Sequence, residues 1–359
     1  MKEKLNFFHI MMLIYMAEKN VTFFSLPRQV AANIGTNGWI IFILLSMVAV
    51  VNILLFWVVY RLGRGSSAFE ILESVLPRFL LYPMYILLSC FWIVAAACIG
   101  KNFFLGYRMS VFPTTNPNYI YLLFCFMLFT LLIKPIYNVS KANTVFFLMT
   151  FWIMMLCFTH VKDWEAVRFT TFWFTDNPEK HSFINYWEIY TSFVGFEFCV
   201  FLFPYVNKQS KLFKGVILGH CLISLSLLML IIISFGFFSF GQLLTYSYPV
   251  VNLLDYIEFS FSNRIENMVL ALFMLANLIV TYMFSFAALS TWRQMIPRMK
   301  PKRMEFMIVL MVFVIGCFPQ TLLKSDELMQ NVLYIESSLG VLIPLCLLAA
   351  LFLNKLKVR

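Results

Sequence analysis

Hydrophobic residues run through this 359-residue chain in ten long stretches that short polar or basic segments separate. A helix needs about 20 apolar residues to cross the hydrocarbon core of a bilayer, and each stretch approaches or exceeds that length. The pattern therefore predicts an all-α integral membrane protein with ten transmembrane helices in one polytopic domain, residues 1–359. The predicted spans are 7–32, 38–60, 79–106, 119–136, 142–161, 186–206, 212–236, 266–292, 304–323 and 331–353.

Two of these spans are interrupted by polar residues near their middle. The first contains Glu18-Lys19-Asn20, and the sixth contains Gly195 followed closely by Glu197. A charge at mid-bilayer costs several kcal/mol or more, so such residues usually have a function. Interrupted helices in equivalent positions of two halves are typical of transporters with a central binding site. We therefore expect a 5+5 inverted repeat, about 7–161 and 186–353, with helices 1 and 6 broken.

The breaks suggest specific chemistry, with a plainer alternative for each. A half-helix that begins near Asn20 would direct its N-terminal amides into the membrane centre, where they attract an anion such as an amino-acid carboxylate. Glu197 would accept a ligand ammonium or carry a proton. In the alternative, Glu18 and Lys19 neutralise each other, and Glu197 makes only a structural hydrogen bond to a neighbouring helix.

Other polar residues within the spans are expected to have structural roles. His220 is interpreted as a packing histidine, Glu336 as an interfacial residue near the outer end of span 10, and Lys101 as a residue that reaches the outer surface. A polar stripe follows span 8 and faces protein or a cavity, so it either lines the site or holds helices together. The stripe consists of Asn277, Thr281, Tyr282 and Ser285.

Lys and Arg determine the expected orientation. Most of the 27 basic residues lie near the ends of spans that would be cytoplasmic if the N-terminus were inside. Because cytoplasmic loops are enriched in Lys and Arg, both termini are predicted to be cytoplasmic. The two long outside loops are then 161–185 and 237–265, and the second is expected to hold a short interfacial helix over the site.

Composition narrows the function classes. The chain is 62% hydrophobic and 12% charged, with a mean hydropathy of +0.84, whereas soluble domains have about 25% charged residues. Its net charge of +10 comes from short clusters between apolar runs, so no nucleic-acid partner is expected. P-loop, GxSxG and HExxH signatures are absent from the sequence, as is any Cys or His spacing of a metal site. We expect neither an enzyme nor a cofactor.

Several short segments, in order and spacing, resemble the permease-like B subunit of spore germinant receptors, in the amino acid–polyamine–organocation transporter superfamily. The segments are Leu26-Pro27 followed by Trp39, then Gly195-Phe196-Glu197 with Phe203-Pro204-Tyr205, then Tyr248-Pro249, Tyr256-Ile257-Glu258 and Arg264-Ile265-Glu266. The resemblance implies a leucine-transporter-like fold in the inner membrane of a spore. It also implies a small nutrient germinant as ligand, together with A-type and lipoprotein C-type receptor subunits as partners.

The resemblance also implies which residues meet the ligand, between the unwound parts of spans 1 and 6 and against spans 3 and 8. Where the family usually has Gly at the first break, this chain has Asn20, which is bulkier and is expected to shrink or re-aim the pocket. The implied ligand-binding residues are Asn20, Val21, Thr22, Ser25, Trp92, Ala96, Gly195, Phe196, Glu197, Thr281, Tyr282 and Ser285. Glu197, Glu18 and Lys19 are the candidates for proton or charge coupling.

Three functions share this pattern. A receptor would bind the nutrient and pass a conformational change to its partner subunits. A proton-coupled amino-acid transporter would use the same pocket, with Glu197 as its coupling group. A scaffold subunit would keep the fold without binding. The residues alone do not separate these functions, and the resemblance favours the receptor.

Overall fold

The structure, a computed structural model, describes residues 4–19, 22–110, 114–169, 182–206, 211–257 and 265–357. These residues are helical apart from connecting segments and a bridge between Leu5 and Val206. The helices are α1 (Phe7–Ala17), α2 (Thr22–Asn33), α3 (Gly38–Leu62), α4 (Ala68–Glu73), α5 (Arg78–Ser110), α6 (Pro117–Leu132), α7 (Ile136–Phe151), α8 (Ile153–Cys157), α9 (Phe183–Tyr190), α10 (Cys199–Leu202), α11 (Leu212–Phe237), α12 (Phe240–Thr245), α13 (Pro249–Asp255), α14 (Ile265–Met295), α15 (Pro301–Gly316) and α16 (Leu322–Lys357). The 3-10 turns are η1 (Phe158–Asp163), η2 (Ala166–Phe169), η4 (Thr191–Phe193), η5 (Phe196–Phe198) and η6 (Phe203–Tyr205).

Helices occupy all ten predicted ranges, and the described residues form six helices long and apolar enough to cross a membrane. The full number of ten crossings stays a prediction. One boundary differs in a way that affects the site: α16 begins at Leu322, not near 331. The polar residues 324–327 resemble a loop in sequence, but they form the first turns of this helix.

Local signals account for where several helices begin. Asn116 caps α6, with Pro117 at the first helical position, where its missing N–H is not needed. In α12, Ser239 and Gln242 form a reciprocal capping box. The expected helix in the second outer loop is present as α13, which packs against α2.

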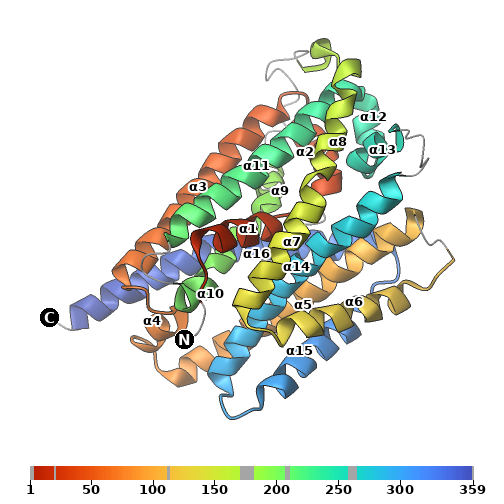
Figure 1. Ribbon diagram of the computed structural model, residues 1–359. Coiled ribbons are helices and arrows are strands. Elements are labelled where there is room, and N and C mark those ends of the chain that lie inside the picture. Colours follow the sequence, from red (N-terminus) through yellow and green to blue (C-terminus); the bar gives the residue numbers. More distant parts are fainter. Residues whose placement is uncertain are drawn as a thin grey trace.

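Helix α14 is the core of the bundle. It packs along α5 and also contacts α7, α6 and α1, while α1 lies between α11 and α7 (Figure 1). The apolar stretch of α14 is 78% buried, against 28% for that of α3. Polar side chains on α14 are therefore enclosed by protein, whereas α3 leaves much of its apolar surface exposed, as expected beside lipid.

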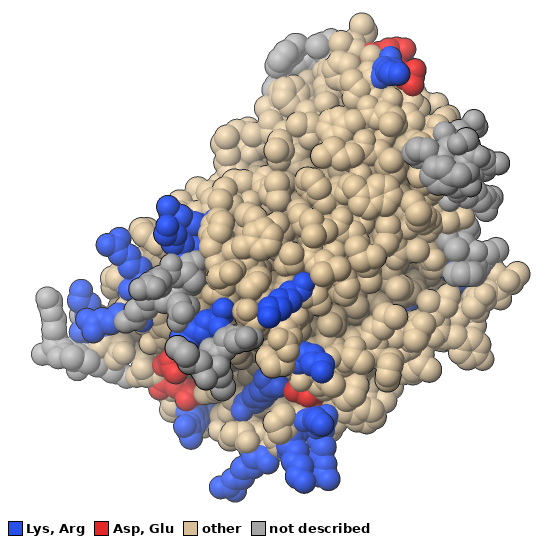
Figure 2. Space-filling view, in the orientation of Figure 1, with Lys and Arg blue, Asp and Glu red and all other residues tan. Residues whose placement is uncertain are grey.

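The basic residues gather at one end of the bundle, which is also where both chain termini lie (Figures 1 and 2). Arg61 lies in the last turn of α3 and Arg293 in the last turn of α14, while Lys214 and Lys302 lie in the first turns of α11 and α15. This asymmetry is the one that the positive-inside rule associates with a cytoplasmic face.

Candidate functional site

The two predicted helix breaks lie against each other. Helix α1 ends at Ala17, and the sixth segment is interrupted at Gly195, which has φ +140°. A Cβ atom at Gly195 would lie 2.7 Å from the carbonyl carbon of Ala17 and 2.7 Å from the nitrogen of Glu18. Glycine is therefore required twice here, for its backbone conformation and for the close approach of the two chains.

Glu197 lies at this junction and is almost fully buried. Both of its carboxyl oxygens are 2.9 Å from the backbone nitrogen of Gly195, which donates to them. Its side chain also lies close to that of Glu336 on α16. Two buried carboxyl groups this close favour a state in which one of them holds a proton, because two ionised carboxylates would repel each other.

Glu336 was expected at the membrane interface, and the structure corrects that expectation. Its side chain is fully buried, and Trp92 Nε1 donates to its two oxygens at 3.1 and 3.4 Å. Trp92 lies on α5, so a single buried carboxyl links α5, α16 and the break of the sixth segment. A carboxylate within an apolar helix is the sequence signal of such a site. The sequence, however, placed Glu336 too close to the outer end of its helix, because α16 begins at Leu322.

Glu18 and Lys19 do not neutralise each other. Glu18 Oε2 lies 2.8 Å from His220 Nδ1, and both side chains are fully buried. His220 Nε2 lies 3.2 Å from the carbonyl oxygen of Ser46 and 3.3 Å from Ser224 Oγ. The Ser46 hydroxyl oxygen also lies 3.2 Å from Nε2, so polar partners surround both ring nitrogens. The interpretation of His220 as a packing residue is therefore incomplete.

Lys19 occupies a different environment, an aromatic box. Its Nζ donates to the carbonyl oxygen of Thr150 at 3.3 Å and lies 5.8, 5.2 and 5.3 Å from the ring centroids of Tyr15, Phe23 and Phe273. The side chain is fully buried, and none of the ion pairs among the described residues includes it. Carbonyl and ring faces, not an anion, stabilise this ammonium.

Lys101 also differs from expectation. Its side chain is buried and donates to Asn118 Oδ1, with Nζ 5.4 Å from the ring centroid of Tyr121. It does not extend to the outer surface. The interior of the bundle therefore holds at least two lysines supported by neutral groups.

A polar cavity of about 430 Å³ lies at the end of the bundle opposite the basic face, between α2, α9 and the first turns of α16. Thr22 and Ser25 line it, as do charged residues of both signs that sequence reasoning missed: Arg28, Glu188 and Asp326. Asn102 Nδ2 donates to Asp326 at 2.7 Å, and Tyr334 Oη donates to Glu188 at 3.3 Å. Arg28, Ala32, Ser247 and Leu323 in its lining are exposed, so the cavity is accessible from outside.

Tyr248 contributes a hydroxyl to the same lining. Burial raises the pKa of Tyr248, and the nearby Asp326 carboxylate raises it further, while Arg28 acts in the opposite direction. The hydroxyl therefore stays protonated at any physiological pH and is able to donate a hydrogen bond to a ligand.

The other predicted site residues are distributed unevenly. Asn20 and Val21 lie outside the described residues. Ala96 is buried on α5 one turn from Trp92, and Phe196 is buried beside Phe56 and His220. Phe196 therefore lies at the junction, beside the partner of Glu18.

On α14, the predicted polar stripe does not line this cavity. Ser285 Oγ donates to the carbonyl oxygen of Thr281 in its own helix, and Thr281 faces Gly100 of α5. Tyr282 stacks on Phe286. Nothing in the sequence distinguished a stripe that faces α5 from one that faces the cavity, because both faces of a core helix are buried.

Comparison with known proteins agrees with this architecture. The fold is similar to that of a Na⁺-coupled sialic acid symporter in a substrate-bound, outward-open state, with a TM-score of 0.61 and 14% identity over 94% of this chain and 79% of that one. The sequence is similar to Spore germination protein B2 of Bacillus subtilis (strain 168), with 20% identity over 265 residues, 72% of this chain and 70% of that protein. The family described as Spore germination protein matches residues 4–325. The chain is thus a multi-pass membrane protein with a transporter-type fold, and it belongs to the spore germination permease family.

Proposed function

We propose that this chain is the nutrient-sensing subunit of a spore germinant receptor, and that it binds a small nutrient and triggers germination by a conformational change. The observation that carries the proposal is the accessible polar cavity, which extends from the outer end of the bundle to Thr22 and Ser25, just after the first helix break. A pocket at a helix break is where transporter folds hold their ligands.

The chemistry of the cavity favours a zwitterion such as an amino acid. Arg28 offers a cation for a carboxylate, and Asp326 and Glu188 offer acceptors for an ammonium. Its volume of about 430 Å³ lies within the range of small-molecule sites. The carboxylate and the ammonium of such a ligand would each face a side chain of opposite charge, so the bound state would leave little unpaired charge in the cavity.

Signalling follows from where the lining residues come from. Helix α2 belongs to the first half of the chain, while α9 and α16 belong to the second half. A ligand that contacts all three would favour the arrangement in which they are close together. Such a ligand shifts the equilibrium only by its difference in affinity for the two arrangements.

The wider architecture belongs to the same proposal. The chain would cross the spore inner membrane ten times as a 5+5 inverted repeat, with both termini in the cytoplasm. It would work beside an A-type subunit and a lipoprotein C-type subunit, and it would catalyse no reaction. The basic end that carries both termini supports this orientation.

A second candidate function is proton-coupled transport of an amino acid. The buried carboxyl pair of Glu197 and Glu336 favours it, because buried carboxyls within membrane segments are typical of proton relays. Uptake into proteoliposomes driven by a proton gradient, and lost in Glu197→Gln, would support transport. Nutrient binding without accumulation would support the receptor.

The test of the receptor uses spores that lack this chain, complemented with wild type or a variant and exposed to amino acids, sugars and nucleosides. We expect Asp326→Asn and Arg28→Gln each to raise the nutrient concentration for half-maximal germination by about tenfold or more, since each removes a charged hydrogen bond. The matched controls are Glu327→Gln and Lys324→Gln, which are exposed on α16 and do not line the cavity.

Each outcome has a clear meaning. Loss of response to one nutrient class, with normal responses in both controls, supports the receptor and identifies the ligand class. If spores that lack the chain still respond normally to every nutrient, the receptor proposal is contradicted. If only deletion has an effect and the cavity variants respond normally at normal protein level, the chain acts as a scaffold.

A further inference from the structure

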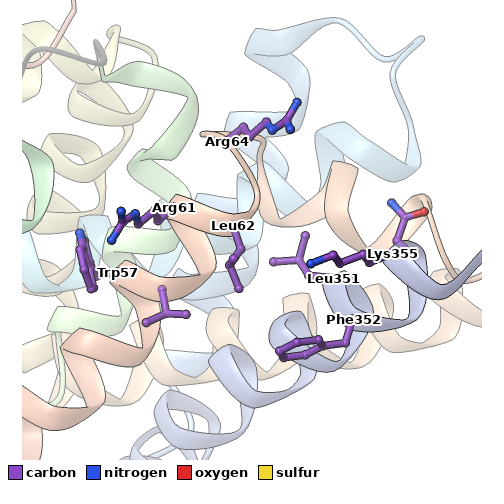
Figure 3. Close-up of a pocket in the computed structure, with 9 residues that line it drawn as sticks. Trp57, Arg61, Leu62, Arg64, Leu351, Phe352 and Lys355 are labelled. Atoms are coloured by element: carbon purple, nitrogen blue, oxygen red, sulfur yellow. The ribbon is translucent and has the colours of Figure 1, made fainter. Parts of the chain in front are cut away.

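A second cavity lies at the opposite, basic end of the bundle, between the last turns of α3 and α16 (Figure 3). Its volume is about 960 Å³, at the upper end of the range for ligand sites. We call it the basic groove and define it by six of its lining residues. These are Trp57, Arg61, Leu62 and Arg64, from α3 and the turn after it, and Phe352 and Lys355, from α16.

The charge of the basic groove is of one sign. Arg61, Arg64 and Lys355 line it, whereas no Asp or Glu does among the residues that the structure describes. None of the ion pairs among the described residues includes these three side chains. The guanidinium of Arg61 lies 5.4 Å from the ring centroid of Trp57, so stacking holds one of the cations in place. The groove therefore presents basic side chains from both helices, with Arg61 turned toward Trp57 (Figure 3).

Arg64 has a backbone conformation that favours glycine. Its φ is +53°, and the following Gly65 N donates to the carbonyl oxygen of Tyr60 at 3.1 Å, in the loop that ends α3. Helices that end in this way usually have glycine at the left-handed position. An arginine at this position points to a use for its guanidinium, since the turn itself does not need it.

The backbone amides of the turn have partners already. Arg64 N donates to the carbonyl oxygen of Arg61, and Ser66 N donates to that of Gly63. An anion in the groove would therefore be held by the three basic side chains, and its affinity would depend on them directly.

Apolar surface completes the groove. Trp57, Leu62 and Phe352 are 40%, 51% and 60% exposed, and they lie beside the cations where the apolar span of α3 ends. Tryptophan and basic residues at the end of an apolar helix are typical of the headgroup level of a bilayer. An occupant with an anionic head and an apolar tail matches both parts of this surface.

We propose that the basic groove binds the headgroup phosphate of an anionic phospholipid. Arg61, Arg64 and Lys355 contact the phosphate, while Leu62 and Phe352 contact the first methylene groups of the acyl chains. Bound lipid bridges the ends of α3 and α16, which come from different halves of the chain. A plainer explanation is that the basic residues only complement the negative ends of the two helix dipoles. That explanation predicts no preference among lipids.

The experiment measures lipid retained by the full-length protein in native mass spectra, and its melting temperature, during titration with phosphatidylglycerol or phosphatidylcholine. The variants are Arg61→Gln/Arg64→Gln/Lys355→Gln and the single Arg64→Gly. The control is Arg298→Gln/Lys300→Gln/Lys302→Gln, which removes the same charge from exposed positions at the same end. Arg64→Gly is informative because glycine suits the turn, so this variant should fold at least as well as wild type.

We expect wild type to prefer phosphatidylglycerol to phosphatidylcholine, and the groove triple variant to bind phosphatidylglycerol about tenfold or more weakly, with the control unchanged. Arg64→Gly should bind more weakly at unchanged or higher melting temperature. Equal loss in the control, equal retention of both lipids, or unchanged binding in the groove variants would overturn the proposal. Stabilisation by inorganic phosphate or glycerol 3-phosphate alone would instead indicate a soluble phosphate ligand and would also overturn it.

Discussion

Glu18 Oε2 lies 2.8 Å from Nδ1 of His220, although the two residues are 202 positions apart in the chain. Neither side chain is exposed. The pair joins the end of α1 to the middle of α11, directly beside the place where Gly195 meets the backbone of Ala17 and Glu18. The first helix break is therefore held by a buried carboxyl–imidazole contact on one side and by a glycine contact on the other.

This pair should be more sensitive to the loss of one partner than to the loss of both. We expect His220→Leu to destabilise the protein by about 3–5 kcal/mol, because it leaves the Glu18 carboxylate buried and unpaired. The double variant Glu18→Gln/His220→Leu should recover most of that loss. Chemical denaturation in detergent measures the free energy of unfolding of both variants. A double variant no more stable than His220→Leu would contradict the pairing of the two side chains.

The contact between Glu197 and Glu336 predicts a protonated carboxyl inside the bundle at neutral pH. Infrared spectra of the purified protein should show the C=O stretching band of a carboxylic acid, with a shift in D₂O. The band should disappear in Glu197→Gln/Glu336→Gln and persist in Glu18→Gln, which serves as the control. A spectrum unchanged by the double substitution would mean that the pair holds no proton.

Substitution of Gly195 should prevent folding before it affects ligand binding. We expect Gly195→Ala to cost about 3 kcal/mol or more, because the methyl group meets backbone atoms that cannot rotate away and φ is unfavourable. The measurement is protein level in the membrane together with melting temperature. Gly241→Ala is the control, since a Cβ there meets nothing within 4 Å. Wild-type stability of Gly195→Ala would show that the two breaks separate easily.

Substitution of Lys19 should have a different effect from substitution of Gly195: the protein should stay stable but lose its function. A methionine has nearly the same length and suits the box of Tyr15, Phe23 and Phe273, so Lys19→Met should change stability by less than about 1 kcal/mol. A fully buried lysine that has no ion-pair partner among the described residues indicates a function. We therefore expect loss of the germination response at normal protein level. A normal response would leave Lys19 as a structural residue.

Sequence reasoning found both helix breaks, because a charge or a glycine in an apolar run is visible without any knowledge of neighbours. It placed Glu336 wrongly because α16 begins earlier than its hydropathy indicates. At 1.5 Å per residue, Glu336 lies about 21 Å from the start of this helix, within the bundle and not at its edge. The same early start places Asp326 on the outer cavity. The sequence analysis had predicted no ligand-binding residue from span 10.

The sequence by itself determined what depends on position along the chain: the apolar helices, the end that carries the basic residues, and the two breaks. Only the tertiary structure decided which polar groups meet, namely Glu18 with His220, Glu336 with Trp92 and Lys19 with its aromatic rings. Hydropathy tells that a residue is buried, but not which helix it faces. That choice depends on how side chains on neighbouring helices interdigitate, and it involves residues far apart in sequence.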